Sequence, residues 1–133
     1  MKTSNFFRAG IIVLLLTPSV LFGQSYQLPS EIVTALEKSD AAQLSNYFGT
    51  TVELTVLNQN DVYSKQQATG ILTDFFRRNT VTSYQSLHGG NKDAASFAIG
   101  NLNTTSRAFR IYVLIRSVSG QPVIQQLRIE AND

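Results

Sequence analysis

The spacing of apolar residues changes along this chain from helical to alternating. In residues 29–36 and 40–49, apolar side chains recur every three or four positions, which predicts two short helices. Residues 51–57 then alternate between apolar and polar, as a half-buried strand does. The first half of the domain is therefore expected to contain two helices followed by a strand.

A turn-rich break at 58–61 separates this strand from the best-marked helix of the chain, at 64–79. Ser64 and Gln67 have the spacing of a capping box, in which each side chain bonds the backbone N–H of the other residue. Two arginines fall in the last turn, where positive charge stabilises the helix dipole.

From residue 81 onward the alternation predicts four strands, at 81–87, 94–102, 107–118 and 122–130. The gaps between them are short, which favours hairpins and sequential antiparallel pairing. The predicted fold is α+β, with three helices packed on a curved, mostly antiparallel sheet in the order ααβαββββ.

Alternation also predicts which side chains of the last two strands face the helices. The inward set is Phe109, Ile111, Val113 and Ile115, followed by Val123, Gln125, Leu127 and Ile129. The outward set is Arg110, Tyr112, Leu114 and Arg116, followed by Gln126, Arg128 and Glu130.

The first 23 residues have the pattern of a secretory signal peptide. Lys2 and Arg8 precede an apolar run, and Pro18 follows that run. The apolar run is interrupted at 17–19, too early for a membrane-spanning helix, and the chain has no cysteine for a lipoprotein anchor. We expect a signal peptide at 1–23, a single exported domain at 24–133, either periplasmic or secreted, and no membrane span after cleavage.

Composition narrows the classes of partner. Lys plus Arg falls from 11 to 9 when Lys2 and Arg8 are removed, which balances the 9 Asp plus Glu. A near-neutral domain lacks the basic surface that binds nucleic acid. The single histidine, His88, and the absence of cysteine argue against a metal site, and no phosphate-binding or dinucleotide motif suggests a cofactor.

Five short stretches carry a family resemblance: Tyr63-Ser64-Lys65, Phe75-Phe76, Ala98-Ile99-Gly100, Phe109-Arg110-Ile111-Tyr112, and Gln125-Gln126-Leu127-Arg128-Ile129-Glu130. With the predicted order of elements, the chain resembles the nuclear transport factor 2-like, or cystatin-like, α+β cone. The stretches are similar to a secreted bacterial branch classed as a domain of unknown function. This resemblance implies a cone over residues 31–130, and similar cones pair through the sheet.

Enzymes with this cone place an Asp base, or an Asp and His pair, inside it. In this chain Asp61 is expected in a turn, Asp74 on the solvent side of a helix and Asp93 in a hairpin, so no catalytic residue is assigned. A lyase or isomerase that uses His88 is the less favoured alternative to a non-catalytic domain.

The favoured function is an exported cone that binds a small, mostly apolar molecule or is filled by its own side chains. Tyr47, His88 and Gln125 are the candidate polar contacts, although each also fits a structural role: a lid on the core, a histidine bonded to backbone, and a satisfied amide. The candidate apolar lining is Phe48, Leu72, Phe75, Phe97 and Ile111.

The alternative function is a protein-interaction or dimerisation module of the cell envelope. Arg110, Tyr112, Arg116 and Arg128 are the candidate contacts with a partner, with a homodimer through the sheet face as the expected assembly. A solvated sheet face covered by long side chains explains the same pattern.

Overall fold

The computed structural model describes residues 26–132, and the expected signal peptide lies outside the described residues. The elements are α1 (Ser30–Glu37), α2 (Ala41–Ser45), β1 (Phe48–Val56), β2 (Gln59–Ser64), α3 (Lys65–Arg78), β3 (Val81–Lys92), β4 (Ala95–Thr104), β5 (Ala108–Val118) and β6 (Gln121–Ala131). In residues 26–132, no helix is both long enough and apolar enough to span a bilayer.

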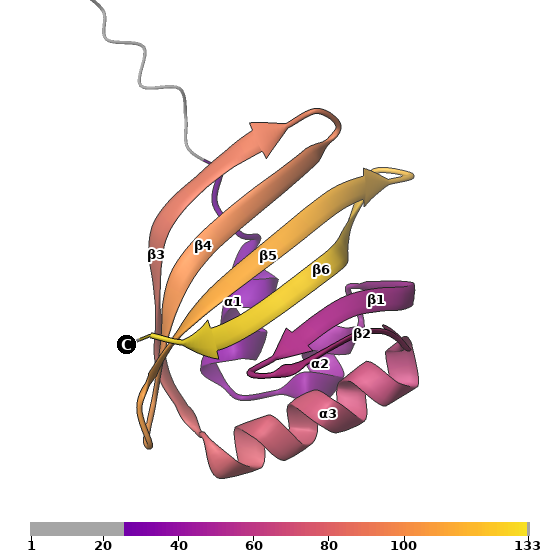
Figure 1. Ribbon diagram of the computed structural model, residues 1–133. Helices are drawn as coiled ribbons and strands as arrows, with labels where there is room; N and C mark the ends of the chain where they lie inside the picture. The colour runs from indigo at the N-terminus through magenta and orange to yellow at the C-terminus, as the bar shows by residue number, and fades with distance from the viewer. Residues whose placement is uncertain (1–25, 133) are drawn as a thin grey trace, which may run out of the picture.

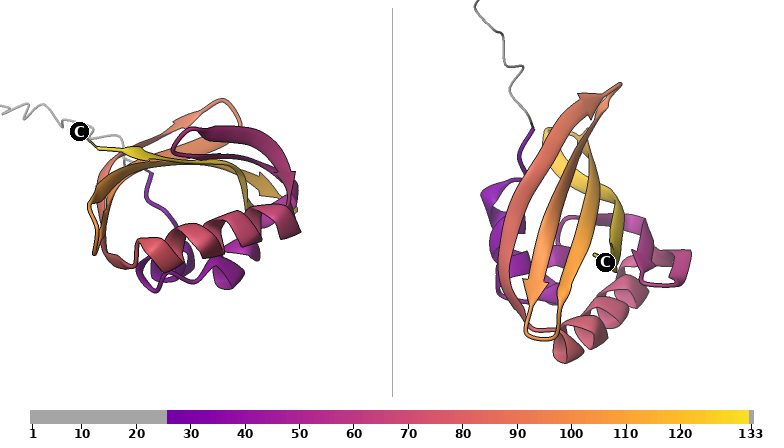
Figure 2. Two further views of the ribbon diagram at one scale, coloured as in Figure 1. Left: turned by 60° about the horizontal axis from the view of Figure 1, so that its bottom comes forward. Right: turned by 60° about the vertical axis from the view of Figure 1, so that its left-hand side comes forward.

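One curved sheet of six strands covers one side of the three helices (Figure 1). Its strand order is β2-β1-β6-β5-β4-β3, and neighbouring strands are antiparallel except for the parallel pair β1 and β6. The left view of Figure 2 shows the sheet arching over the helices, which lie on its concave face. The predicted α+β cone is confirmed.

Strand β2 was not expected. The predicted break at 58–61 is instead a tight turn at Leu57 and Asn58 followed by a strand, in which Gln59 pairs with Val56. β2 is an edge strand with little buried surface, and only Tyr63 on it is half-buried. An edge strand of this kind lacks the apolar alternation by which a strand is recognised.

The capping box of α3 is present as expected. Gln67 N donates to Ser64 Oγ at 3.2 Å, and Ser64 N donates to Gln67 Oε1 at 3.1 Å. The helix buries one face against the sheet through Ala68, Leu72, Phe75 and Phe76. At the start of helix α2, Asp40 Oδ1 accepts a hydrogen bond from Gln43 N at 2.9 Å.

The inward face of β5 is buried as predicted, with Phe109, Ile111, Val113 and Ile115 all at most 4% exposed. The prediction for β6 is wrong at its beginning. Ile124 is fully buried, whereas Val123 and Gln125 are only half-buried. The pairing of β5 with β6 shifts at this point, because Leu114 pairs with Gln126 but Ile115 with Ile124. Gln125 is thus the extra residue of a β-bulge, and the bulge reverses the alternation before it.

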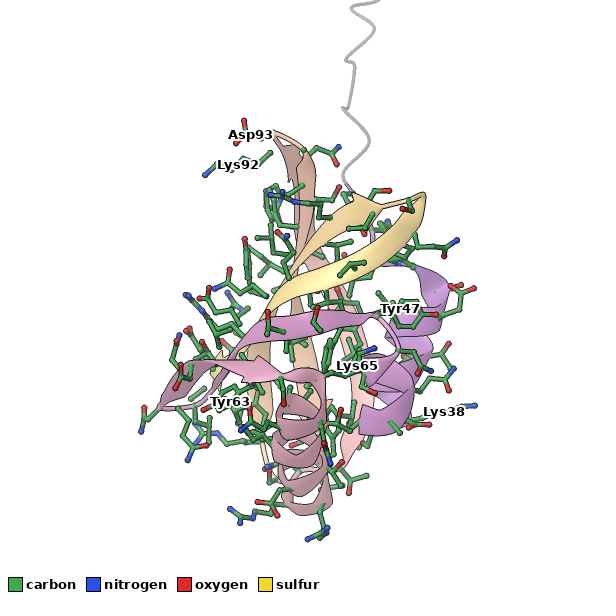
Figure 3. All side chains as sticks on the ribbon, turned by 90° about the vertical axis from the view of Figure 1, so that its right-hand side faces the viewer. Lys38, Tyr47, Tyr63, Lys65, Lys92 and Asp93 are labelled. Atoms are coloured by element: carbon green, nitrogen blue, oxygen red, sulfur yellow. The ribbon has the colours of Figure 1, made fainter. Side chains whose placement is uncertain are left out.

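The prediction that the strand starting at residue 81 ends at residue 87 is also wrong. β3 continues through His88, Gly89 and Gly90 to Lys92, and the chain turns at Asp93, at the far tip of the β3–β4 hairpin (Figure 3). The two glycines allow close approach within a strand instead of forming a turn.

The chain before α1 packs against the domain. Leu28 is 7% exposed, and Tyr26 packs against the buried core. The carbonyl oxygen of Tyr26 occupies the space that a β-carbon on Gly89 would take. This N-terminal segment therefore covers the concave side of β3.

Candidate functional site

Four of the expected pocket-lining residues are packed inside the domain. Phe48, Leu72, Phe75 and Ile111, from β1, α3 and β5, are each at most 5% exposed. The ring of Phe75 meets that of Phe109 edge-on, with centroids 5.0 Å apart. These side chains form the central packing between α3 and the sheet.

Tyr47 lies where the chain passes from the helices into the sheet (Figure 3). Its side chain is half-buried against the core, and its carbonyl oxygen accepts a hydrogen bond from Ile124 N at 2.6 Å. The backbone of Tyr47 thus joins β1 to β6 at the bulged end of β6.

His88 and Phe97 lie on the opposite, convex face of the sheet. Phe97 alternates with the buried Ala98, and its ring is stacked with that of Tyr112 at 6.2 Å between centroids. The ring of the exposed His88 lies 5.6 Å from that of Phe97. These two residues therefore lie next to the expected partner contacts and not among the concave lining.

Gln125 borders a hollow of about 440 Å³ between β1 and β6. These strands separate there, because Phe48 pairs with Ile124 but the next pair is Glu53 with Gln126. Gln126 Nε2 donates to Glu53 Oε2 at 2.9 Å at the point where the strands rejoin. Neither Tyr47 nor His88 lines this hollow, so the three expected polar contacts do not surround one cavity.

The four expected partner contacts do share one face. Arg110 and Arg116 on β5 are exposed, while Tyr112 and Arg128 are half-buried and directly opposite each other on β5 and β6. Next to them, the convex face presents apolar side chains from β4 and β5, all half-buried: Phe97, Ile99 and Leu114.

Arg128 has an unusual environment on this face. Its Nε is buried without a hydrogen-bond partner, and Glu130 Oε1 lies 3.6 Å away as an ion pair. Glu130 also pairs in register with Arg110. The convex face therefore combines stacked aromatic rings with charges of both signs.

Two tyrosines that the sequence analysis did not select lie on the concave side. Burial raises the pKa of Tyr26. Burial also raises the pKa of Tyr84; a hydrogen bond with Ser86 lowers it, and the charge of Tyr26 raises it further. The phenol groups are therefore close enough to affect each other. The sequence feature that accompanies Tyr84 is Gly100, a glycine inside a strand. A β-carbon at this position would collide with the Tyr84 ring.

The described residues place no carboxylate inside the core. In residues 26–132, the buried polar side chains are those of Ser45 and Thr55. The same range contains no group of three or more His, Asp or Glu that could hold a metal ion.

The curved sheet, with its strands in the order given above and the helices on its concave face, has the fold of a nuclear transport factor 2-like cone. This fold defines the class of the protein. Residues 29–130 match the family described as Domain of unknown function (DUF4783), and the chain belongs to this family. No match was found among curated proteins.

Solved structures agree with this assignment. A DUF4783 family protein from Bacteroides ovatus is 33% identical, covers 80% of this chain and 96% of its own, and has a TM-score of 0.75. A second, from Bacteroides fragilis, is 34% identical over 80% of this chain and 100% of its own, with a TM-score of 0.74. A member of the nuclear transport factor 2-like family from Streptomyces avermitilis shares the fold at 9% identity, 78% and 90% coverage and a TM-score of 0.57.

Proposed function

We propose that this domain is a non-catalytic interaction module that pairs with a second copy of itself through the convex face of the sheet. The observation that carries this proposal is the half-buried aromatic and aliphatic cluster of Phe97, Ile99, Tyr112 and Leu114, bordered by arginines. Protein interfaces combine an apolar, aromatic centre with a polar rim in this way, and arginine and tyrosine are enriched in them.

The register of β5 and β6 favours one arrangement of the two copies. A two-fold axis across the strands would bring Arg110 towards Arg116 of the second copy, and like charges would repel. The alternative is an axis parallel to the strands, between β5 and β6. Each residue of β5 then lies opposite a β6 residue of the second copy, the same one that it pairs with inside its own copy. Arg110 then faces Glu130, and Tyr112 faces Arg128. Sheets packed in this aligned way cross at only about 30°, so the pairing extends along the strands.

This arrangement is supported by the environment of Arg128. Its Nε is buried and unpaired by hydrogen bonds within one copy. A tyrosine ring stacked over the guanidinium supplies a cation–π contact, which is stronger when the charge is removed from water. The ring of Tyr112 on the second copy fits this role.

Charge reversal tests the proposal. Arg110→Glu and Glu130→Arg should each weaken self-association at least about tenfold, because each places like charges opposite one another. Mixing the two variants should restore association as a heterodimer, since every intermolecular pair is then complementary. In each variant, residues 110 and 130 of the same copy carry like charges, and mixing the variants does not change this. Recovery of association in the mixture therefore reports contacts between copies and not contacts within one copy. Sedimentation equilibrium measures all three samples.

Arg77→Glu is the matched control. Arg77 is an exposed arginine on α3, distant from the convex face, and its reversal should leave self-association unchanged. A wild-type protein that remains monomeric at high concentration, or a mixture that associates no better than either variant, would refute the proposed dimer.

We propose further that the domain works after export, with residues 1–23 removed. The charged start, apolar run and Pro18 support this proposal. Mass determination of the protein purified from its native host should find a chain that begins at or near Gln24. A full-length chain in the cytoplasm would contradict it.

A further inference from the structure

A second hollow lies outside both the concave core and the convex face, between the β1–β2 turn and α3. Its volume is about 530 Å³, within the usual range for small-molecule sites. It is lined by Val56, Leu57, Asn58, Gln59, Ile71, Asp74, Phe75, Arg78 and Asn79. In Figure 1 the β1–β2 hairpin lies above α3.

One part of this hollow is apolar. Val56 and Phe75 are 8% and 5% exposed, and Ile71 is half-buried beside them. Leu57 lies at the edge and is 45% exposed, one of the few large apolar side chains in residues 26–132 that solvent reaches to this extent. These four side chains provide a surface for an apolar chain.

The backbone of Leu57 is in the left-handed region, with φ of 57°. A leucine there is disfavoured because its β-carbon crowds the backbone, whereas asparagine tolerates this conformation. Leu57 is fixed by its N–H, which donates to the carbonyl oxygen of Ile129 at 2.8 Å. An exposed leucine in a strained conformation at the edge of a hollow is the kind of outlier that accompanies a binding role.

The other part of the hollow presents hydrogen-bond donors. Arg78 contributes a guanidinium that is exposed to solvent, and Asn58 and Gln59 contribute amides. The single carboxylate of the lining, Asp74, is already engaged by Arg78 at 2.9 Å and by Arg77 at 3.5 Å. A guanidinium has five N–H donors, so one ion pair leaves Arg78 able to bind a second carboxylate.

We infer that this hollow binds an aliphatic carboxylic acid of medium chain length. The chain lies against Val56, Ile71 and Phe75, and Leu57 covers it. The carboxylate accepts hydrogen bonds from Arg78 and from the amides beside it. This site is independent of the proposed dimer, because its lining residues come from the β1–β2 turn and α3.

Calorimetric titration of the purified protein with decanoate tests the carboxylate contact. Arg78→Gln should weaken binding of decanoate at least about tenfold, because it removes a charge-assisted hydrogen bond. Arg77→Gln is the matched control, since Arg77 is equally exposed and pairs with the same Asp74 but does not line this hollow. Decanol, which lacks the carboxylate, should bind the wild type about as weakly as decanoate binds Arg78→Gln.

Leu57→Asn separates binding from folding. This change should raise the Tm by a few degrees, because asparagine tolerates the left-handed backbone, and should weaken decanoate binding. Leu87→Asn is the control, since Leu87 is 46% exposed on β3 and does not line the hollow. Equal losses for Arg77→Gln and Arg78→Gln, decanol binding as tight as decanoate, or no binding of millimolar decanoate would each overturn the inference.

Discussion

The carbonyl oxygen of Tyr26 lies against Gly89 of β3, in the space where any other residue would place its β-carbon. The N-terminal segment can cross the concave face here because position 89 has no side chain. Gly89→Ala should displace this segment and destabilise the domain by about 1–3 kcal/mol, the usual cost of overpacking. Urea denaturation, followed by tyrosine fluorescence, measures the change.

Gly70→Ala is the comparison for this effect. Gly70 lies within α3, and a β-carbon there would meet nothing within 4 Å apart from the backbone of its own helix and its neighbours in the chain. Alanine should therefore stabilise the helix by up to about 1 kcal/mol. If Gly89→Ala is also neutral or stabilising, the N-terminal segment does not pack against β3 as described.

Alternation was sufficient to predict the buried face of β5, but it failed for β6. Val123 and Ile124 are both apolar, so the sequence offers two phases that differ by one residue. The bulge at Gln125 selects Ile124 for the core, and that bulge depends on pairing with β5. Local sequence contains no information on this partner, so the choice between the two phases could not be made in advance.

The expected site was predicted less well than the fold, for a related reason. The predicted strand 81–87 ends just before His88, because the two glycines that follow His88 are typical of a turn. Gly89 instead makes room for Tyr26, from a distant segment, and Gly90 makes room for the ring of Phe97, its partner on β4. Strand alternation alone was enough to predict the residues on the outer face of β5 and β6, and these residues do lie together.

The tyrosines on the concave side predict a loss of stability in alkaline solution. The pKa of both Tyr26 and Tyr84 is raised by burial, so the folded state holds their protons more tightly than the unfolded state does. Their contribution to stability is complete below about pH 10 and is lost as the pH rises through the folded-state pKa values.

Absorbance titration at alkaline pH, with unfolding followed in parallel, measures this effect. Two of the five tyrosines should ionise later than the others. Tyr26→Phe should remove one late ionisation and lower the pKa of Tyr84 towards its usual value, since the charge of Tyr26 no longer opposes the ionisation of Tyr84. Five tyrosines that titrate together in the folded protein would contradict the description of this pair.

Ile111 tests whether the concave residues are packing or a binding surface. Its side chain is fully buried among core residues, so Ile111→Ala should destabilise the domain by about 2–5 kcal/mol. A residue that contacts only a bound molecule would give a much smaller change in the protein alone. Thermal unfolding of the purified variant distinguishes these outcomes, and Val62→Ala, at a position 59% exposed on β2, is the control.

The capping box at the start of α3 gives the last prediction. Ser64 Oγ accepts the hydrogen bond of Gln67 N, which otherwise has no partner within the helix. Ser64→Ala should therefore cost about 1 kcal/mol, whereas Ser30→Ala, whose hydroxyl makes only an exposed contact of 3.4 Å with Glu31, should cost almost nothing. Both variants are compared by urea denaturation. Because α3 carries Leu72 and Phe75 into the core, loss of its cap should lower the stability of the whole domain in one transition, and fraying confined to α3 would contradict this coupling.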